Sequence, residues 1–348
     1  MMSANFDEYY KVLSADFPEW LHDYINTKEL QTQKYISVTC GIIYSELFNF
    51  GPFYSSFDHS IAVALVVWHF THDKKQTLAG LFHDISTPAF KHCVDFMNGD
   101  HMKQESTEGL TSEFIRRSDD AMKLLKRDGI SLEEIDDYHI YPIADNDTPQ
   151  LSADRLEYSF SNALWRHNLL TLDEVRELYE DIEVQRNETG EVELGFKTKA
   201  LARKFVLITS KMSVLYRNDK TRYSMQFLAD ILKRMCADGL VTVDELYDIK
   251  ESDLIERIQK SKYGEVFRAW QKAKRVHSSA TKPEGVYFVK QPAKIRYIDP
   301  LCRVSGAQGA TQAPQYARMS KICKIADKAI KKNLAYDMNN YVWLNFDF

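Results

Sequence analysis

Four residues of the chain have side chains that could together hold a divalent metal ion. They are His59, the adjacent pair His83 and Asp84, and Asp154. Imidazole nitrogens and carboxylate oxygens in one set suit transition metals, and carboxylates also suit Mg. Such a set leaves coordination positions for water and for a phosphate oxygen, as a hydrolase requires. We therefore expect one divalent metal ion, drawn from Mn, Fe, Co, Ni, Zn and Mg, at a hydrolytic site.

A second His-Asp dipeptide shows that neighbouring ligand types alone do not define a site. His72 and Asp73 lie in a polar break between two apolar segments. They have no flanking apolar framework to hold them in place. We interpret this dipeptide as part of a solvated loop.

The candidate ligands lie on or beside segments that predict buried helices. Residues 57–70 are almost entirely apolar after His59, as in a helix that is buried on all sides, and residues 74–84 predict the next helix. Upstream, residues 6–26 and 29–48 have helical spacing and predict two opening helices.

Later helix starts are predicted by capping boxes, in which a hydroxyl residue precedes a glutamate by three positions. The boxes are Ser131 with Glu134, Thr171 with Glu174, and Thr242 with Glu245. Alternating apolar residues on both sides of a turn at 187–190 predict one peripheral β-hairpin over residues 182–196.

The composition favours helices. The chain has 348 residues but only 13 Gly and 9 Pro, too few for an all-β sandwich. We predict an all-α fold with a helical domain over residues 1–272 and a metal core at about 30–170. Residues 273–348 form a linker and a short mixed extension, with strand character at 286–289 and 294–298, a loop at 305–315 and a last helix at 316–335.

Charge and apolar runs restrict the location and the partners. The formal net charge is -5, which lacks the broad positive charge of proteins that coat nucleic acid. The longest apolar run, residues 61–68, is too short to cross a membrane. The five cysteines form no CxxC pair, which is typical of reduced thiols. We expect a cytoplasmic protein that binds neither membranes nor nucleic acid.

Three segments around the candidate ligands resemble the successive metal motifs of HD-superfamily phosphohydrolases. They are residues 57–64, 79–85 and 152–158. Within that superfamily, residues 83–92 are similar to the motif of deoxynucleoside triphosphate triphosphohydrolases, in which Pro, Phe and His follow the His-Asp pair; here these are Pro88, Phe90 and His92. The likeness extends loosely from about residue 30 to residue 300.

The resemblance implies an HD-domain helical bundle that hydrolyses a phosphoester or phosphoanhydride of a nucleotide, and a chain that assembles into homo-oligomers. It implies that His59, His83, Asp84 and Asp154 bind the metal. It also implies that Arg155 faces phosphate and that Tyr158 and Tyr216 line the nucleoside. Arg155 is a permanent cation beside a metal carboxylate, which suits it to phosphate.

The chain departs from the family at three positions. Ser56 stands where the family often has Arg, Thr87 where it has His, and Gln104-Glu105 near another family His. His92 and His101 are therefore the candidates for general acid or base, followed by Glu105. His92 could equally orient a metal ligand.

These departures keep alternatives open. A catalytically degenerate HD protein would bind a nucleotide or a protein partner without hydrolysing it. A di-iron oxygenase would use His92 or His101 as extra ligands for a second iron.

Overall fold

The computed structural model of the chain describes residues 6–100, 102, 108–304 and 315–346. The predicted catalytic candidates His101 and Glu105 and most of the predicted loop at 305–315 lie outside the described residues.

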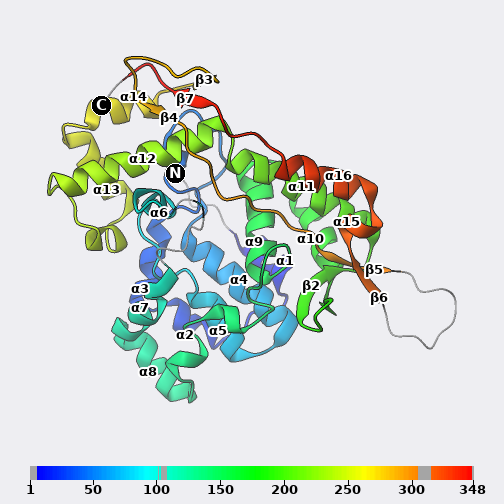
Figure 1. The fold of residues 1–348 in the computed structure, drawn as a ribbon. Helices are drawn as coiled ribbons and strands as arrows, with labels where there is room; N and C mark the ends of the chain where they lie inside the picture. Colours follow the sequence, from blue (N-terminus) through cyan, green and yellow to red (C-terminus); the bar gives the residue numbers. More distant parts are fainter. Residues whose placement is uncertain (1–5, 101, 103–107, 305–314, 347–348) are drawn as a thin grey trace.

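Helices dominate the described residues, and their order is shown in Figure 1. The α-helices are α1 Asp7–Leu13, α2 Leu21–Ile25, α3 Lys28–Thr32, α4 Ser56–Thr71, α5 Lys74–Phe82, α6 Cys93–Met97, α7 Thr111–Arg117, α8 Asp119–Asp128, α9 Ala153–Ser161, α10 Leu172–Glu180, α11 Lys199–Tyr216, α12 Asp219–Ala237, α13 Glu251–Lys260, α14 Gly264–Gln271, α15 Met319–Ile322 and α16 Lys324–Leu334. Shorter turns are the 3-10 helices η1 Gln33–Tyr35, η2 Ile42–Tyr44, η3 Glu108–Leu110, η4 Leu132–Glu134, η5 Tyr138–Ile140 and η7 Asp244–Tyr247, and the π-helix η6 Asn162–Arg166.

Two small sheets accompany the helices, so the predicted helical character is confirmed but "all-α" was too narrow. The strands are β1 Ile182–Arg186, β2 Val192–Phe196, β3 His277–Ser279, β4 Phe288–Val289, β5 Leu301–Val304, β6 Gln315–Arg318 and β7 Tyr341–Trp343. They form one sheet in the order β1-β2-β5-β6 and another in the order β3-β7-β4.

The predicted hairpin forms, but it is not an isolated peripheral element. β1 and β2 pair antiparallel, with Ile182 opposite Phe196. On its other edge β2 pairs in parallel with β5. Leu194 and Phe196 are buried in the core. The extra strands come from the C-terminal part of the chain, whose long sequence separation hides the pairing from local patterns.

The helices predicted around the ligands form, whereas the two opening helices do not. α4 and α5 occupy nearly the predicted ranges, and residues 72 and 73 form the break between them. Residues 6–48 instead form α1, α2, α3 and two 3-10 turns. Pro18 cannot continue a helix, and Gly41 adopts a left-handed φ of 75° between short elements.

Other predicted boundaries also needed correction. The boxes at Ser131 and Thr242 precede the 3-10 turns η4 and η7, and only the Thr171 box starts an α-helix, α10. Residues 294–298 form no strand, and the last predicted helix is divided into β6, α15 and α16.

Two clusters of buried apolar residues hold the elements together. The larger cluster joins α1, α4, α5, α9, α11 and β2, and the smaller one joins α6, α12, α13, α14 and β4. Residues after 272 enter both clusters: Ile298 and Cys302 the larger, and Val289 and Val342 the smaller. The boundary at residue 272 stays a prediction. In Figure 1 the C-terminal segment, drawn in orange and red, runs from the side of α14 to α16, which packs on α11.

Across the part of the chain that the structure describes, no helix is both long enough and apolar enough to span a bilayer.

Candidate metal centre

The ends of α4 and α5 place two histidines side by side. Ser55 and Asp58 form a capping box at the start of α4, so His59 lies in its first turn, and His83 directly follows the last residue of α5. The two helices pack closely at Gly80, where an added Cβ would lie 3.2 Å from Cγ2 of Val67. This close approach brings the imidazole rings to a centroid distance of 5.1 Å.

Asp154 completes a three-residue cluster. It lies in the first turn of α9, which Ser152 caps. Its Oδ1 atom lies 3.1 Å from Nε2 of His59 and 3.8 Å from Nε2 of His83. Ligand atoms from all three residues lie within 4.8 Å of one another, a spacing that could hold a metal ion.

Both histidines turn the same ring nitrogen, Nε2, toward this cluster because the other nitrogen has a fixed partner. Nδ1 of His83 lies 2.7 Å from the carbonyl oxygen of Gly80, to which it donates. Nδ1 of His59 contacts the carboxylate of Glu157. A carboxylate or carbonyl behind each imidazole is the usual arrangement for histidines that ligate metals, because it fixes the tautomer and leaves Nε2 to accept a cation.

Glu157 is an important residue of this region that the sequence analysis did not single out. It is fully buried, and its Oε1 accepts hydrogen bonds from the hydroxyls of Tyr9 at 3.0 Å and Tyr54 at 2.7 Å. Its spacing of three residues from Asp154 was the only available signal. The distant tyrosines could not be assigned to it from sequence.

The electrostatics of the cluster favour bound positive charge. Burial lowers the pKa of His59, but the carboxylates of Glu157 and Asp154 outweigh this effect and raise it to about 10. Burial raises the pKa of Asp154, but the hydrogen bond and charge of His59 lower it to about 2. The buried acidic groups thus hold a proton on His59, and a divalent cation could take the place of that positive charge. The donor set and its charge fit such an ion, which His59, His83 and Asp154 would hold.

The fourth predicted ligand, Asp84, lies beside the cluster but has a different neighbour. Its Oδ2 is 3.9 Å from Nε2 of His83 and only 2.6 Å from Nζ of Lys91. Burial raises the pKa of Asp84, but Lys91 and the two histidines more than offset this and hold it well below its usual range. Lys91 follows Phe90 in a turn where both residues have positive φ, at 42° and 63°. The role of Asp84 as a ligand stays a prediction.

His92, a predicted acid or base, lines the same cavity and is held by a carboxylate. Its Nδ1 lies 2.9 Å from Oδ2 of the fully buried Asp95, three residues later. Burial lowers the pKa of His92, and the charges of Arg296 and Lys91 add to that effect against Asp95. His92 is therefore neutral at pH 7, a state that can accept a proton. Asp95 was not among the residues predicted from the sequence, although it follows His92 by three positions.

A cavity of about 660 Å³ contains this centre and extends beyond it. The predicted substrate residues Arg155, Tyr158 and Tyr216 all line it. Burial raises the pKa of both tyrosines, so they are neutral. The volume suits a small molecule of nucleotide size.

The guanidinium of Arg155 already has partners within the protein. It donates hydrogen bonds to Oδ1 of Asn146 at 2.5 Å and to the carbonyl oxygen of Gln150 at 3.2 Å, and it lies 3.4 Å from Asp145. Its proposed contact with phosphate stays a prediction.

The cavity has further walls that the sequence analysis did not predict. His139 lines it, with Nε2 at 3.5 Å from Asp145. Arg166 and Arg222 line it from η6 and α12, and Lys294 and Arg296 from the segment before β5. Nothing in the local sequence of these residues indicates that the fold brings them together.

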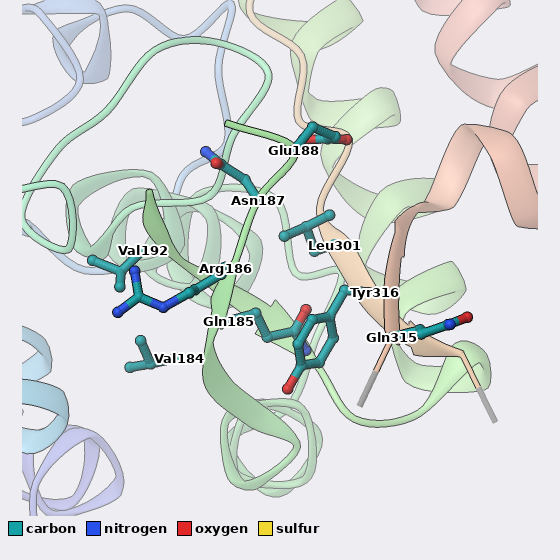
Figure 2. A pocket seen from close by; sticks show the side chains of 9 residues that line it. All are labelled: Val184, Gln185, Arg186, Asn187, Glu188, Val192, Leu301, Gln315 and Tyr316. Atoms are coloured by element: carbon teal, nitrogen blue, oxygen red, sulfur yellow. The ribbon is translucent and has the colours of Figure 1, made fainter. Parts of the chain in front are cut away.

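A second hollow, of about 690 Å³, lies at the strands β1, β2, β5 and β6 (Figure 2). Its charged side chains have partners at the strands: Arg186 donates to the carbonyl oxygen of Gly190, and Glu188 pairs with Arg318. The candidate metal cluster lies in the other cavity, so we assign the candidate site there.

Comparisons with known proteins agree with the fold. No family model matches the chain. The uncharacterized protein YdhJ of Bacillus subtilis is 23% identical over 248 residues, which cover 70% of this chain and 73% of that protein.

Two solved structures match nearly the whole length. A hypothetical protein from Aquifex aeolicus has a TM-score of 0.61 at 14% identity, over 94% of this chain and 93% of that one. A phosphohydrolase from Bacteroides thetaiotaomicron has a TM-score of 0.61 at 12% identity, over 94% and 96%. The chain therefore shares the fold of a phosphohydrolase, in agreement with the resemblance found in its sequence.

Proposed function

We propose that the chain is a metal-dependent phosphohydrolase of the HD superfamily that cleaves a small phosphorylated molecule, a nucleotide. The observation that carries this proposal is the convergence of Nε2 of His59, Nε2 of His83 and the carboxylate of Asp154 in a cavity of nucleotide size. The fold shared with a phosphohydrolase supports it. A divalent cation supplies Lewis acidity, which polarises a phosphoryl oxygen and makes water a better nucleophile at neutral pH.

The residues of the chain have separable tasks in this proposal. Glu157 orients His59, and Asp95 orients His92, which is neutral and placed to accept a proton. Arg155 contacts a phosphate group, and Tyr158 and Tyr216 pack against the remainder of the substrate. The specificity for deoxynucleoside triphosphates is the finer prediction, and Ser56 and Thr87 weaken it because they replace two family side chains that handle phosphate.

The test is product release by purified protein that has been stripped of metal and reloaded with Mn, Fe, Co, Ni, Zn or Mg. The substrates are deoxynucleoside and ribonucleoside mono- and triphosphates, and the assay separates inorganic phosphate from triphosphate. We expect hydrolysis that Asp154→Asn abolishes and that the exposed control Asp173→Asn leaves unchanged. Absence of hydrolysis with every metal, while metal analysis finds one ion per chain, would contradict the proposal.

One observation favours the alternative of a binding protein without activity. The ammonium of Lys91 lies 2.6 Å from Asp84 and so neutralises a predicted ligand. In that case a nucleotide would raise the melting temperature of the protein without being consumed.

A further inference from the structure

Arg166 is a half-buried cation in the wall of the cavity, and among the described residues it has no acidic partner. Its Nε atom is buried without a hydrogen-bond partner, and its hydrogen bond from Nη1 to Oδ1 of Asn162 is long, at 3.4 Å. Within the described residues, no carboxylate lies within ion-pair distance of it. Burying a charge without a counter-charge costs free energy, so an anionic ligand would stabilise this arrangement.

Three other cations of the same cavity are paired with neighbouring carboxylates. Lys91 pairs with Asp84 at 2.6 Å, and Arg222 with Asp219 at 2.6 Å. Arg155 lies 3.4 Å from Asp145. The unpaired state of Arg166 is therefore not a general property of the cavity.

Aromatic rings hold the Arg166 side chain in place. Its Cζ lies 4.9 Å from the ring centroid of Phe50 and 5.2 Å from that of Tyr216. The adjacent His167 is neutral, because burial and the charge of Arg166 lower its pKa to about 3. The guanidinium is thus fixed before any ligand arrives, which reduces the entropy lost on binding.

A π-helix in the backbone directs Arg166 toward the cavity. Asp154 and Tyr158 in α9 and Asn162 at its C-cap follow at intervals of four, and all three line the cavity with Arg166. In a regular α-helix, twelve residues at about 100° each would rotate Arg166 roughly 120° away from Asp154. The π-helix Asn162–Arg166 has more residues per turn, so it brings Arg166 back toward the cavity side.

This spacing separates Arg166 from the metal centre. Twelve residues at about 1.5 Å each span roughly 18 Å of α-helix axis. The Arg166 side chain can recover only part of that length, so one phosphate group cannot contact both it and the metal ligands, whereas a nucleoside with a phosphate at each end could. The two tyrosines Tyr158 and Tyr216 lie along the same cavity.

We propose that Arg166 forms a second anion-binding subsite, and that the ligand is a phosphorylated compound with a second phosphate group, of the class of nucleoside 3′,5′-bisphosphates. One phosphate lies at the metal centre and the other accepts hydrogen bonds from Arg166. Arg296 and Lys294 line the same cavity and add positive potential. This inference rests on the proposed function, because it names the substrate class of that site.

The test measures binding to the metal-loaded protein, with recovery of the intact ligand checked after each titration, so that it does not depend on hydrolysis. Dissociation constants are compared by calorimetry for adenosine 3′,5′-bisphosphate and adenosine 5′-monophosphate, and for the guanosine pair, at one ionic strength. We expect the bisphosphate of at least one pair to bind about tenfold or more tightly, as for a hydrogen bond to a charged group. Arg166→Met should remove this preference, Arg166→Lys should keep part of it, and the surface control Arg176→Met should keep all of it.

Equal affinities within both pairs, or the same preference in Arg166→Met, would overturn the subsite. Arg166→Lys keeps the inference falsifiable if the Met variant does not fold. A preference that depends on Arg166 supports the subsite even if no metal form of the protein hydrolyses either compound, and in that case the proposed hydrolysis alone fails.

Discussion

The two ends of the cavity differ in how the protein treats buried charge. At the metal centre every charged group has partners: Glu157 holds His59, and Asp84 faces Lys91. At the other end Arg166 has aromatic neighbours, and no carboxylate of the described residues lies within ion-pair distance of it. The side chains of the metal centre are thus held by one another, and their acidic groups favour a bound cation. At the other end, the positive charge of Arg166 is left for a ligand to neutralise.

The buried residues Glu157 and Glu251 differ in the same way, since one has a charged partner and the other does not. Both are fully buried and both accept a hydrogen bond from a tyrosine. Glu157 also contacts His59, whereas no cation within the described residues forms an ion pair with Glu251. Glu251, at the start of α13, instead accepts from the hydroxyl of Tyr44 at 2.9 Å and from the N–H of Phe90 at 3.2 Å.

The largest expected effect is on the metal centre itself. Because the cluster of His59, His83 and Asp154 demands positive charge, saturating divalent metal should stabilise the folded protein by about 3–4 kcal/mol at 100 to 1,000 times its dissociation constant. Thermal unfolding with and without a chelator measures this. Asp154→Asn should lose most of the gain, and an equal gain in that variant would show that metal binds elsewhere.

The metal end was also the part that the sequence could predict. His59 and Asp154 lie in the first turns of helices and His83 directly follows one, each inside a short motif, and the resemblance of these motifs to known metal motifs selected them. Glu157 and Arg166 were missed because their meaning depends on distant residues: Tyr9 lies 148 positions from Glu157. The opening helices failed for a related reason, since the spacing of apolar residues in 6–48 reflects burial in the core rather than helical continuity.

The next effect is a change in the stability of the protein with pH, caused by Glu251. Burial raises its pKa to about 7 in the folded protein, from 4.5. Between these values the folded state binds more protons than the unfolded state, so stability falls as the pH rises from about 4.5 to 7. The shift corresponds to about 3 kcal/mol.

The measurement is the free energy of unfolding in urea at several pH values for the wild type and Glu251→Gln. The variant should lack this loss, so the difference between the two proteins should change by about 3 kcal/mol across the window. A constant difference would mean that the carboxylate stays ionised in the fold.

A smaller effect is expected at Glu157. Glu157→Gln keeps the shape of the side chain but removes the charge behind His59, so metal affinity should fall by about 10- to 100-fold. Titration with Mn or Zn, followed by calorimetry, measures this directly. Tyr179→Phe is the matched control, because its hydroxyl donates to the carbonyl oxygen of Leu13 and not to Glu157; an equal loss of affinity in both variants would point to a general disturbance of the core.

The smallest effect separates the two arginines of the cavity by stability alone. Arg155→Met removes hydrogen bonds to Asn146 and Gln150 and leaves Asp145 without its cation, so it should destabilise the protein by about 1–3 kcal/mol. Arg166→Met removes a buried charge that has no acidic partner, so stability should stay the same or rise by about 1 kcal/mol. If Arg166→Met instead destabilised the protein as much as Arg155→Met, the fold would depend on that guanidinium. The contrast between a charge that the protein neutralises and one that it leaves for a ligand would then be lost.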